Sequence, residues 1–393
     1  MYKILTLNNI SVKGLERLPR ERYEVASEIA HPDAILVRSA KLHDLAMPDT
    51  VKAIGRAGAG VNNIPVERMT QQGVVVFNAP GANANAVKEL VLAGMLLGAR
   101  QIAQAWAFAR DLTGDDAAIH EQVEKGKKQF VGFELPGRTL GVIGLGAIGV
   151  LVANMARALG MAVVGHDPTL TVRRAWQLSS DVQQALGVDD LLARSDFVTV
   201  HVPLTAETRG MIHAGRFKTM RKGSVLLNFS RDGIIDDEAA CHALDVGKLH
   251  AYVCDFPSNR LKNHPRVITL PHLGASTVEA EENCAIMVAD QIRDYLEDGT
   301  IQNAVNFPEI QLPRGEGYRV AIVNANVPNM VGQISTVLAQ ADLNIQDLLN
   351  KSRGEVAMTL IDLDRDPPQE SLDRIAAITG VLSVRRLGFA HGG

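Results

Sequence analysis

Two side chains that could handle a proton and an anion follow strand-like runs in the second half of the chain. His272 comes just after the run VITL, and Arg231 comes just beyond the run SVLLNF. An imidazole is the usual acid or base near neutral pH, and a guanidinium grips a carboxylate or a polarised carbonyl through parallel hydrogen bonds. Each type alone is more often structural. Together they would suit oxidation of a CH–OH carbon, provided that a hydride acceptor binds nearby.

A glycine-rich run could hold that acceptor. It reads G-x-G-x-x-G, lies between the strand-like TLGVIG and the helical VLVANMARALG, and is followed by Asp167 at the end of the next strand-like run. Such glycines let the backbone approach a pyrophosphate at a helix N-terminus, and an acid about 20 residues later accepts hydrogen bonds from a ribose. The charge of Asp167 favours NAD over NADP, although Arg173 and Arg174 keep NADP open. The predicted loop contacts are Gly144, Gly146, Ala147, Ile148 and Gly149.

Alternating strand-like and helical stretches must position these residues. The first part of the chain holds YKILTLNNI, AILVRSA, VKAIGRAG and GVVVFNAP, and a second series runs from TLGVIGLGAIG to RVITLPHLG. This alternation predicts an α/β fold with two Rossmann-like, doubly wound parallel-sheet domains. The candidate residues follow strands, and ligands of open parallel sheets bind at the carboxyl ends of strands. We therefore expect the candidates to gather at such edges.

The end of the chain has a different order of elements. Proline and glycine residues between Pro313 and Gly317 mark a boundary, and the runs beyond it read strand, helix, strand, strand, helix, strand. This βαββαβ order predicts a ferredoxin-like domain over residues 317–393.

Composition argues against several other classes of protein. The 393 residues suffice for two to three domains, and a net charge of −4 gives no reason to expect a nucleic acid or a membrane as a partner. Cys241, Cys254 and Cys284 show no metal-ligand spacing, so neither a metal site nor a disulfide framework is expected. The N-terminal residues lack the pattern of a signal peptide, which together with the cysteine usage favours a cytoplasmic protein.

Four motifs resemble those of the D-isomer-specific 2-hydroxyacid dehydrogenases: GLGAIG, HVPLTAETRGMI, NFSRDGIID and PHLGAST. Within that family, ILVRSA, GRAGAGVNNIP, FNAPGANANAVKEL and the C-terminal segment are similar to members that oxidise D-3-phosphoglycerate to 3-phosphohydroxypyruvate with NAD, the first step of L-serine biosynthesis. The C-terminal segment resembles an ACT domain, a small amino-acid sensor. The resemblance covers essentially the whole chain.

The resemblance implies a domain organisation and an assembly. Residues 1–97 and 284–312 would form a substrate-binding domain, residues 98–283 an NAD-binding Rossmann domain, and residues 317–393 an ACT regulatory domain. A homodimer would form through the nucleotide domain, and pairing of ACT domains would extend it to a homotetramer. The substrate would be 3-phosphoglycerate, with L-serine as a possible effector.

The resemblance also implies roles for matching residues. Arg231 would bind a substrate oxygen, and His272 would be the acid and base. Further contacts to the cofactor would come from Asp167, Val202, Pro203, Ser230, Asp255 and Gly274. Contacts to the substrate would come from Arg38, Ser39, Arg56, Gly58, Ala59, Gly60, Val61 and Asn83, and the charges of Arg38 and Arg56 suit a phosphate. The serine contacts would be Asn324, Asn326 and Asn344.

One predicted catalytic position departs from the family pattern. A glutamate three residues after the phenylalanine of the DF segment usually pairs with the histidine, and counting from Phe256 that position holds Asn259. An amide oxygen can fix which ring nitrogen of His272 carries the proton, but without a charge it does little to stabilise imidazolium. Asp232 and Glu279 are other carboxylates that could take the place of the missing acid.

Two other functions stay open on the sequence. One is a dehydrogenase or reductase of an unphosphorylated D-2-hydroxy acid. The other is a non-catalytic regulator that responds to NAD and an amino acid, with Asn259 as a sign of lost activity. The presence of both Arg231 and His272 argues against the regulator, because a chain without catalysis has no physical reason to keep them.

Overall fold

The computed structural model describes residues 1–315 and 317–388. The chain forms two compact units: Met1–Ala82 with the residues from Glu281 onward, and Asn83–Ala280. The predicted fold class is confirmed, since two sheets are parallel and a third, at the C-terminal end, is antiparallel. The predicted three-domain division by function remains a prediction.

The first unit begins with a parallel sheet in the strand order β2-β1-β3-β4-β5. Its strands are β1 (Tyr2–Leu7), β2 (Tyr23–Ala26), β3 (Ala34–Val37), β4 (Ala53–Arg56) and β5 (Val75–Phe77). Its helices are α1 (Val12–Leu15), α2 (Val66–Gln71) and α11 (Val278–Asp298). The strands are nearly all apolar because both faces are covered. α11 packs on one face and α2 on the other.

The C-terminal part of this unit is the predicted ferredoxin-like sheet. Its elements are β13 (Tyr318–Ala325), α12 (Met330–Gln340), β14 (Ile345–Arg353), β15 (Val356–Leu363), α13 (Gln369–Ala376) and β16 (Val381–Leu387). The strands are antiparallel in the order β14-β15-β13-β16. This arrangement confirms the predicted βαββαβ order.

Both faces of the C-terminal sheet are covered by apolar side chains. Val320, Ile322 and Ile361 face the two helices α12 and α13. Residues of the opposite parity, such as Met358 and Leu360, share a core with side chains of β5 and α11. All eight residues of β15 are accordingly buried. The C-terminal sheet is therefore a part of the first unit's core.

A buried ion pair reinforces this junction. Arg319 on β13 donates to both carboxylate oxygens of Asp362 on β15, at 2.6 and 2.7 Å. Its other N–H groups reach the carbonyl oxygens of Leu312 at 2.8 Å and Pro313 at 2.9 Å. A second arginine, Arg385 on β16, lies 4.2 Å from the ring centroid of Tyr295. Backbone groups that lead into the sheet are thus held by side chains of the sheet itself.

The second unit is built on seven parallel strands in the order β12-β11-β10-β9-β6-β7-β8. The strands are β6 (Thr139–Ile143), β7 (Ala162–His166), β8 (Gln183–Gln184), β9 (Phe197–Val200), β10 (Ser224–Asn228), β11 (Leu249–Cys254) and β12 (Val267–Thr269). Helices α3 (Ala84–Arg100) and α6 (Ala147–Ala158) cover one face. Helices α8 (Val188–Arg194), α9 (Ala214–Thr219) and α10 (Asp237–Asp245) cover the other. The order reverses between β6 and β9, where such folds bind ligands.

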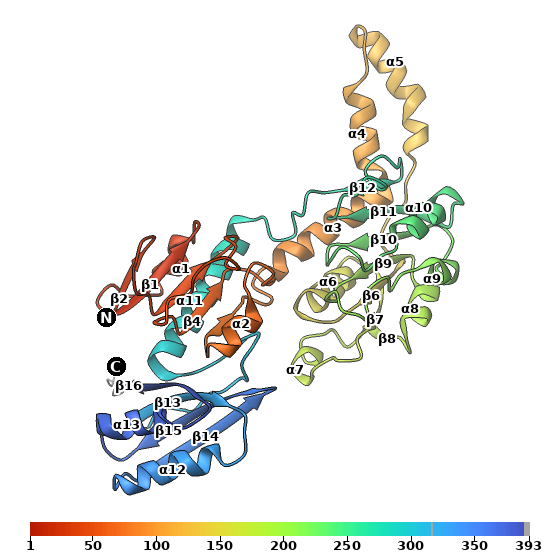
Figure 1. Cartoon of the computed structure of the whole chain (residues 1–393). Coiled ribbons are helices and arrows are strands. Elements are labelled where there is room, and N and C mark those ends of the chain that lie inside the picture. Colours follow the sequence, from red (N-terminus) through yellow and green to blue (C-terminus); the bar gives the residue numbers. More distant parts are fainter. Residues whose placement is uncertain (316, 389–393) are drawn as a thin grey trace. The chain divides into compact units, whose positions relative to one another are not determined.

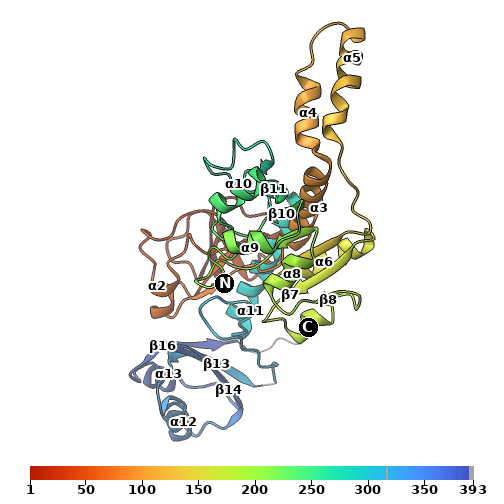
Figure 2. The ribbon, with the colours of Figure 1, turned by 90° about the vertical axis from the view of Figure 1, so that its right-hand side faces the viewer.

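Two helices of the second unit project away from its sheet as a hairpin, hereafter the arm (Figures 1 and 2). They are α4 (Ile102–Arg110) and α5 (Asp116–Gly126), followed by the 3-10 helix η1 (Lys127–Phe130); the short α7 (Val172–Ala175) lies elsewhere in the unit. α4 leaves α3 at a bend of 67°, where Gln101 has a φ of 50°. Among the described residues no single helix is long and apolar enough to cross a membrane, and the bent pair α3–α4 passes only by joint length and composition.

The Arg319–Asp362 pair generates a prediction about stability. Arg319→Ala leaves a buried carboxylate without its partner, so we expect the free energy of unfolding to fall by about 3–5 kcal/mol. Arg365→Ala, which breaks an exposed pair with Asp342, serves as the control and should change stability little. Denaturant unfolding of both variants checks this. Equal stability of the two would contradict a structural role for the buried pair.

Candidate active site

The three glycines of the G-x-G-x-x-G run have different physical roles. Gly144 has a φ of 92°, and a Cβ there would lie 2.6 Å from the carbonyl oxygen of His201. A Cβ on Gly149 would lie 1.9 Å from the carbonyl oxygen of Gly144. A Cβ on Gly146 would meet nothing within 4 Å beyond its chain neighbours. The fold therefore requires the first and third glycines, and the second keeps space open above the loop.

The loop lies at the point where the strand order reverses. It connects the end of β6 to the start of α6, and the end of β9 is its neighbour, since Gly144 approaches His201 and Val202. Asp167, which follows β7, accepts hydrogen bonds from the backbone N–H of Leu145 and of Thr169, both at 2.8 Å. An open glycine turn at a helix N-terminus with an acid beside it fits a dinucleotide.

Arg231 is held at the end of β10 by a residue that the sequence reasoning missed. The buried side chain of Asn228 accepts from the backbone N–H of Ser230 at 3.1 Å and donates to the carbonyl oxygen of Arg231 at 3.0 Å. Ser230 Oγ in turn donates to the carbonyl oxygen of Val202, and Pro203 follows that residue. The signal in the sequence was an amide at the end of an apolar strand, directly before the polar turn.

His272 lies in a turn that a buried carboxylate organises. Its φ is 57°, which is uncommon for a residue with a side chain and costs roughly 1–2 kcal/mol. Asp255, fully buried after β11, accepts from the backbone N–H groups of Leu273 and Gly274, each at 2.8 Å. The His272 ring is exposed and packs edge-on against Phe256, with centroids 5.2 Å apart. Asp255 thereby holds the backbone of the turn that carries the exposed imidazole.

The loop that carries Asn259 makes its contacts elsewhere. Ser258 Oγ donates to Asp237 at 2.8 Å, and Arg260 lies 3.6 Å from Glu238. Burial raises the pKa of Asp237, and the Ser258 hydrogen bond partly opposes that shift. Within the described residues, no hydrogen bond joins Asn259, Asp232 or Glu279 to the His272 ring. The predicted part of Asn259 in catalysis stays a prediction.

A second histidine, His201, lies near the glycine loop and is poorly suited to carry a proton near neutral pH. His201 shares a hydrogen bond between Nε2 and Thr199 Oγ1 at 3.0 Å. Burial lowers its pKa to about 3, so the ring is neutral near neutral pH. The backbone of His201 lies against Gly144 of the loop.

The predicted substrate residues of the first unit follow the ends of β3 and β4. Asn8, after β1, accepts from the backbone N–H of Ala40 at 2.6 Å and of Ser39 at 3.1 Å. Asn78, after β5, donates to the carbonyl oxygen of Ala59 at 2.6 Å. These amides brace the loops that carry Arg38 and the run Gly58–Val61. Their roles were also missed from the sequence.

The two arginines of this set share a neighbourhood. A Cβ on Gly58 would lie 1.6 Å from Arg56 Nη1, so the glycine makes room for that guanidinium. Arg38 Nη2 lies 2.6 Å from Glu281 Oε1. Burial raises the pKa of the Cys284 thiol, and the nearby charges of Arg56 and Arg38 oppose that rise. Asn83 belongs to the second unit, where it is the N-cap residue of α3.

A cavity of about 150 Å³ in the C-terminal sheet gathers two of the three predicted serine contacts. Asn324 and Asn326 line it, together with Asn329 and Asn350. Asn344 does not line it, and its backbone N–H donates to Asp364 at 3.0 Å. The cavity presents side-chain amides, which can donate to a carboxylate and accept from an ammonium group.

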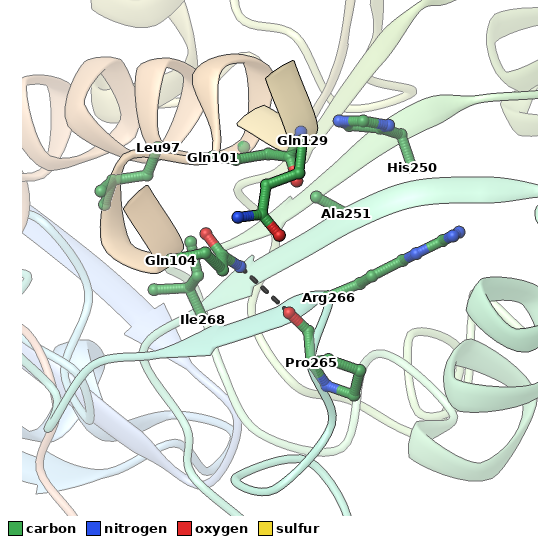
Figure 3. Close-up of a pocket in the computed structure, with 10 residues that line it drawn as sticks. Leu97, Gln101, Gln104, Gln129, His250, Ala251, Pro265, Arg266 and Ile268 are labelled. Atoms are coloured by element: carbon green, nitrogen blue, oxygen red, sulfur yellow. Dashed lines mark hydrogen bonds between the residues drawn. The ribbon is translucent and has the colours of Figure 1, made fainter. Parts of the chain in front are cut away.

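Another cavity, of about 280 Å³, lies at the root of the arm (Figure 3). It is lined by polar side chains such as Gln101, Gln129 and His250, and Gln104 donates across its edge to the Pro265 carbonyl oxygen at 3.1 Å. None of the predicted site residues lines it. Among the described residues, no group of three His, Cys, Asp or Glu side chains could hold a metal ion.

Comparisons with known proteins identify the family of the chain. Residues 102–274 match the family model described as D-isomer specific 2-hydroxyacid dehydrogenase, NAD binding domain. A D-3-phosphoglycerate dehydrogenase of Methanocaldococcus jannaschii is 36% identical over 382 residues, which span 92% of this chain and 70% of that protein. The chain belongs to the D-isomer specific 2-hydroxyacid dehydrogenase family. The predicted family membership and the predicted NAD cofactor are thus confirmed.

Two further family members show the extent of the likeness. A D-3-phosphoglycerate dehydrogenase of Archaeoglobus fulgidus is 38% identical over 314 residues, 77% of this chain but only 56% of that protein. The NAD⁺-bound 3-phosphoglycerate dehydrogenase of Entamoeba histolytica superposes with a TM-score of 0.60 at 27% identity, and covers 78% of this chain and 98% of its own. The chain thus spans little more than half the length of one relative from its family.

The open space above Gly146 generates a prediction about cofactor binding. Gly146→Val places methyl groups where a pyrophosphate would approach, so we expect the Kd for NADH to rise at least tenfold. The thermal unfolding midpoint should be unchanged, because an added Cβ meets no protein atom within 4 Å beyond the chain neighbours. Fluorescence titration and a melting curve measure the two quantities.

The matched control is Gly187→Val, at a helix N-cap of the same unit where a Cβ also meets nothing within 4 Å. It should leave both quantities unchanged. Tight NADH binding by Gly146→Val would show that the dinucleotide does not use this loop.

Proposed function

We propose that the chain oxidises D-3-phosphoglycerate to 3-phosphohydroxypyruvate with NAD⁺, the entry step of L-serine synthesis. The observation that supports this substrate is the pair of arginines Arg38 and Arg56 at the ends of adjacent strands, with the Gly58–Val61 backbone beside them. Two cations and a row of backbone N–H groups suit a phosphorylated acid. Relatives that are 36% and 38% identical carry the name of this activity.

The proposed mechanism assigns one task to each residue. NAD⁺, when bound along the glycine loop, supplies the hydride acceptor. Arg231 binds a substrate oxygen and polarises the C–O bond as it becomes a carbonyl. His272 removes the hydroxyl proton in oxidation and returns it in reduction through a ring nitrogen. Asp255 acts through the backbone: it holds the turn from which the imidazole projects.

Asn259 affects how well the protonated form of His272 is stabilised in the proposed reaction. An amide in place of a carboxylate can orient the His272 ring but does not offset the positive charge that the ring gains on taking a proton. Asp237 lies close to the same loop through Ser258.

The two alternatives make different demands on the same residues. A dehydrogenase of an unphosphorylated D-2-hydroxy acid needs Arg231 and His272 but gains little from both Arg38 and Arg56. A non-catalytic regulator would bind NADH and leave it unreacted. The pair of arginines and the held histidine favour the phosphorylated substrate and catalysis, respectively.

The test is NADH formation from D-3-phosphoglycerate, and its reverse with 3-phosphohydroxypyruvate. We expect turnover by the wild type, and a fall in kcat of about 10²–10⁴ for His272→Asn with unchanged affinity for NADH. His264→Asn, which alters another histidine of the same unit, paired with Asp245, is the control and should stay active. NADH binding without turnover of any keto acid would support the regulator. Faster turnover of D-glycerate would support the unphosphorylated substrate.

The C-terminal sheet is proposed to sense a small amino acid, L-serine. The support is the cavity that Asn324, Asn326 and Asn350 line, since their amides complement both charged groups of an amino acid. Asn350 Nδ2 is 2.7 Å from Thr359 Oγ1, which orients its carbonyl oxygen. Because the sheet shares a core with β5 and α11, ligand binding there bears on the unit that holds the proposed substrate residues.

We expect L-serine to inhibit the wild type, and Asn350→Ala to raise the inhibitory concentration at least tenfold without changing kcat in its absence. Asn350 is exposed on the edge strand β14, so the substitution should not disturb the fold. Asn344→Ala tests the remaining predicted contact. It should retain inhibition if the cavity is the site, and lose it if Asn344 binds the effector. Inhibition curves for the three proteins provide the answer, and insensitivity of the wild type would refute the sensor.

We infer a homodimer in which the arm takes part. Trp106 on α4 is 62% exposed, and Ile102 and Val131 are exposed as well. Exposed apolar side chains on and next to a projecting hairpin are costly in water and suit a protein partner. Pairing of C-terminal sheets along the exposed strand β14 would make a homotetramer.

A further inference from the structure

A carboxylate lies on one of the two cations that the proposed function assigns to the substrate. Arg38 Nη2 and Glu281 Oε1 are 2.6 Å apart, and the two side chains are 40% and 42% exposed. Glu281 belongs to α11, whereas Arg38 directly follows β3. The contact is therefore made by two elements of the first unit that meet at the end of its parallel sheet.

The neighbours of Glu281 show that it belongs to the same cluster as Arg56. Cys284 lies one helical turn beyond Glu281 on α11, and residues three apart share a helix face. The register of the sheet pairs Arg56 with Val37, the residue directly before Arg38. The Cys284 thiol lies within range of the charges of Arg56, Arg38 and Glu281. The cluster of Arg38, Arg56 and Glu281 carries a summed formal charge of +1, where the two arginines alone would carry +2.

We propose that Glu281 is a specificity-determining residue that sets the charge of this anion site. The inference rests on the proposed function, in which Arg38 and Arg56 hold the substrate. A substrate anion that binds Arg38 has to replace Glu281 as its partner. The Glu281 carboxylate then remains beside the bound anion. Its repulsion acts on every anion but is larger for a phosphate, with close to two negative charges, than for a carboxylate with one.

Replacing Glu281 by a substrate anion as the partner of Arg38 requires little free energy. An exposed ion pair contributes little to stability, so separating Arg38 from Glu281 requires little free energy. A phosphate offers three acceptor oxygens to the freed guanidinium. The remaining cost is the proximity of two negative groups, and this cost disappears when the carboxylate becomes an amide. Glu281→Gln preserves the side-chain shape and an oxygen that accepts from Arg38.

The experiment compares Glu281→Gln with Glu282→Gln. Glu282 is the next residue of α11 and pairs with Lys13 at 2.6 Å, so its variant loses the same charge outside the cluster. We expect Glu281→Gln to lower the KM for D-3-phosphoglycerate about five- to tenfold and to change the KM for D-glycerate less than about twofold. Its kcat should be unchanged. Glu282→Gln should alter neither KM.

Glu281→Ala separates charge from positioning. If Glu281 sets charge, alanine lowers the KM for D-3-phosphoglycerate as glutamine does. If Glu281 only orients Arg38, alanine raises that KM and glutamine leaves it unchanged, and this result would overturn the proposal. Equal changes in Glu281→Gln and Glu282→Gln would also overturn it, because the effect would then reflect the net charge of the whole protein.

A binding measurement keeps the inference distinct from the proposed reaction. Inorganic phosphate should raise the melting temperature of Glu281→Gln at a lower concentration than that of the wild type, which requires no turnover. If this shift appears while no variant oxidises D-3-phosphoglycerate, the charge-setting role stands and the proposed reaction fails. If turnover is observed but phosphate and KM respond alike in wild type and variant, the reaction stands and the role of Glu281 is refuted.

Discussion

The turn after β12 depends on one buried carboxylate. Asp255 receives the backbone N–H groups of two consecutive residues, Leu273 and Gly274. Hydrogen bonds to a charged acceptor are the stronger kind, and these two offset the cost of the left-handed backbone at His272. The imidazole of His272 can therefore be exposed while the backbone that carries it is held in place. The same carboxylate has no oxygen free of backbone contact, so its predicted contact with the nicotinamide would have to share these bonds.

Side-chain amides do similar work at the other strand ends. Asn8 and Asn78 brace the loops after β3 and β4, and Asn228 braces the turn of Arg231. An amide both donates and accepts, so one side chain can satisfy an N–H and a C=O of an irregular turn. At these strand ends uncharged side chains hold the backbone beside the charged residues.

The sequence predicted the fold and the loop because those features depend on local pattern. Strand-helix alternation and the glycine spacing are visible in a single stretch, and the structure places the loop between β6 and α6, at the point where the strand order reverses. Asn8, Asn228 and Glu281 could not be found in the same way. Their partners lie on other elements or depend on a turn geometry, and an asparagine or glutamate at such a place is common in any sequence. Asn344 shows the opposite error. The sequence predicted it as a contact in the same site as Asn324 and Asn326, but its side chain does not line the cavity.

The burial of the C-terminal sheet bears on how a sensor could work here. A domain joined by a loose linker would influence the rest of the protein through its own association with another copy. In this chain, Met358 and Leu360 of β15 lie in one core with Phe77 and Tyr295 of β5 and α11. Packed cores tend to switch between discrete arrangements and do not deform continuously. A ligand in the cavity lined by Asn324 and Asn350 that favours one packing of β15 would therefore bias the helix that carries Glu281 and Cys284. Coupling of this kind requires that the ligand bind the two packings with different affinity, and the shared core supplies the physical connection through which that difference would act.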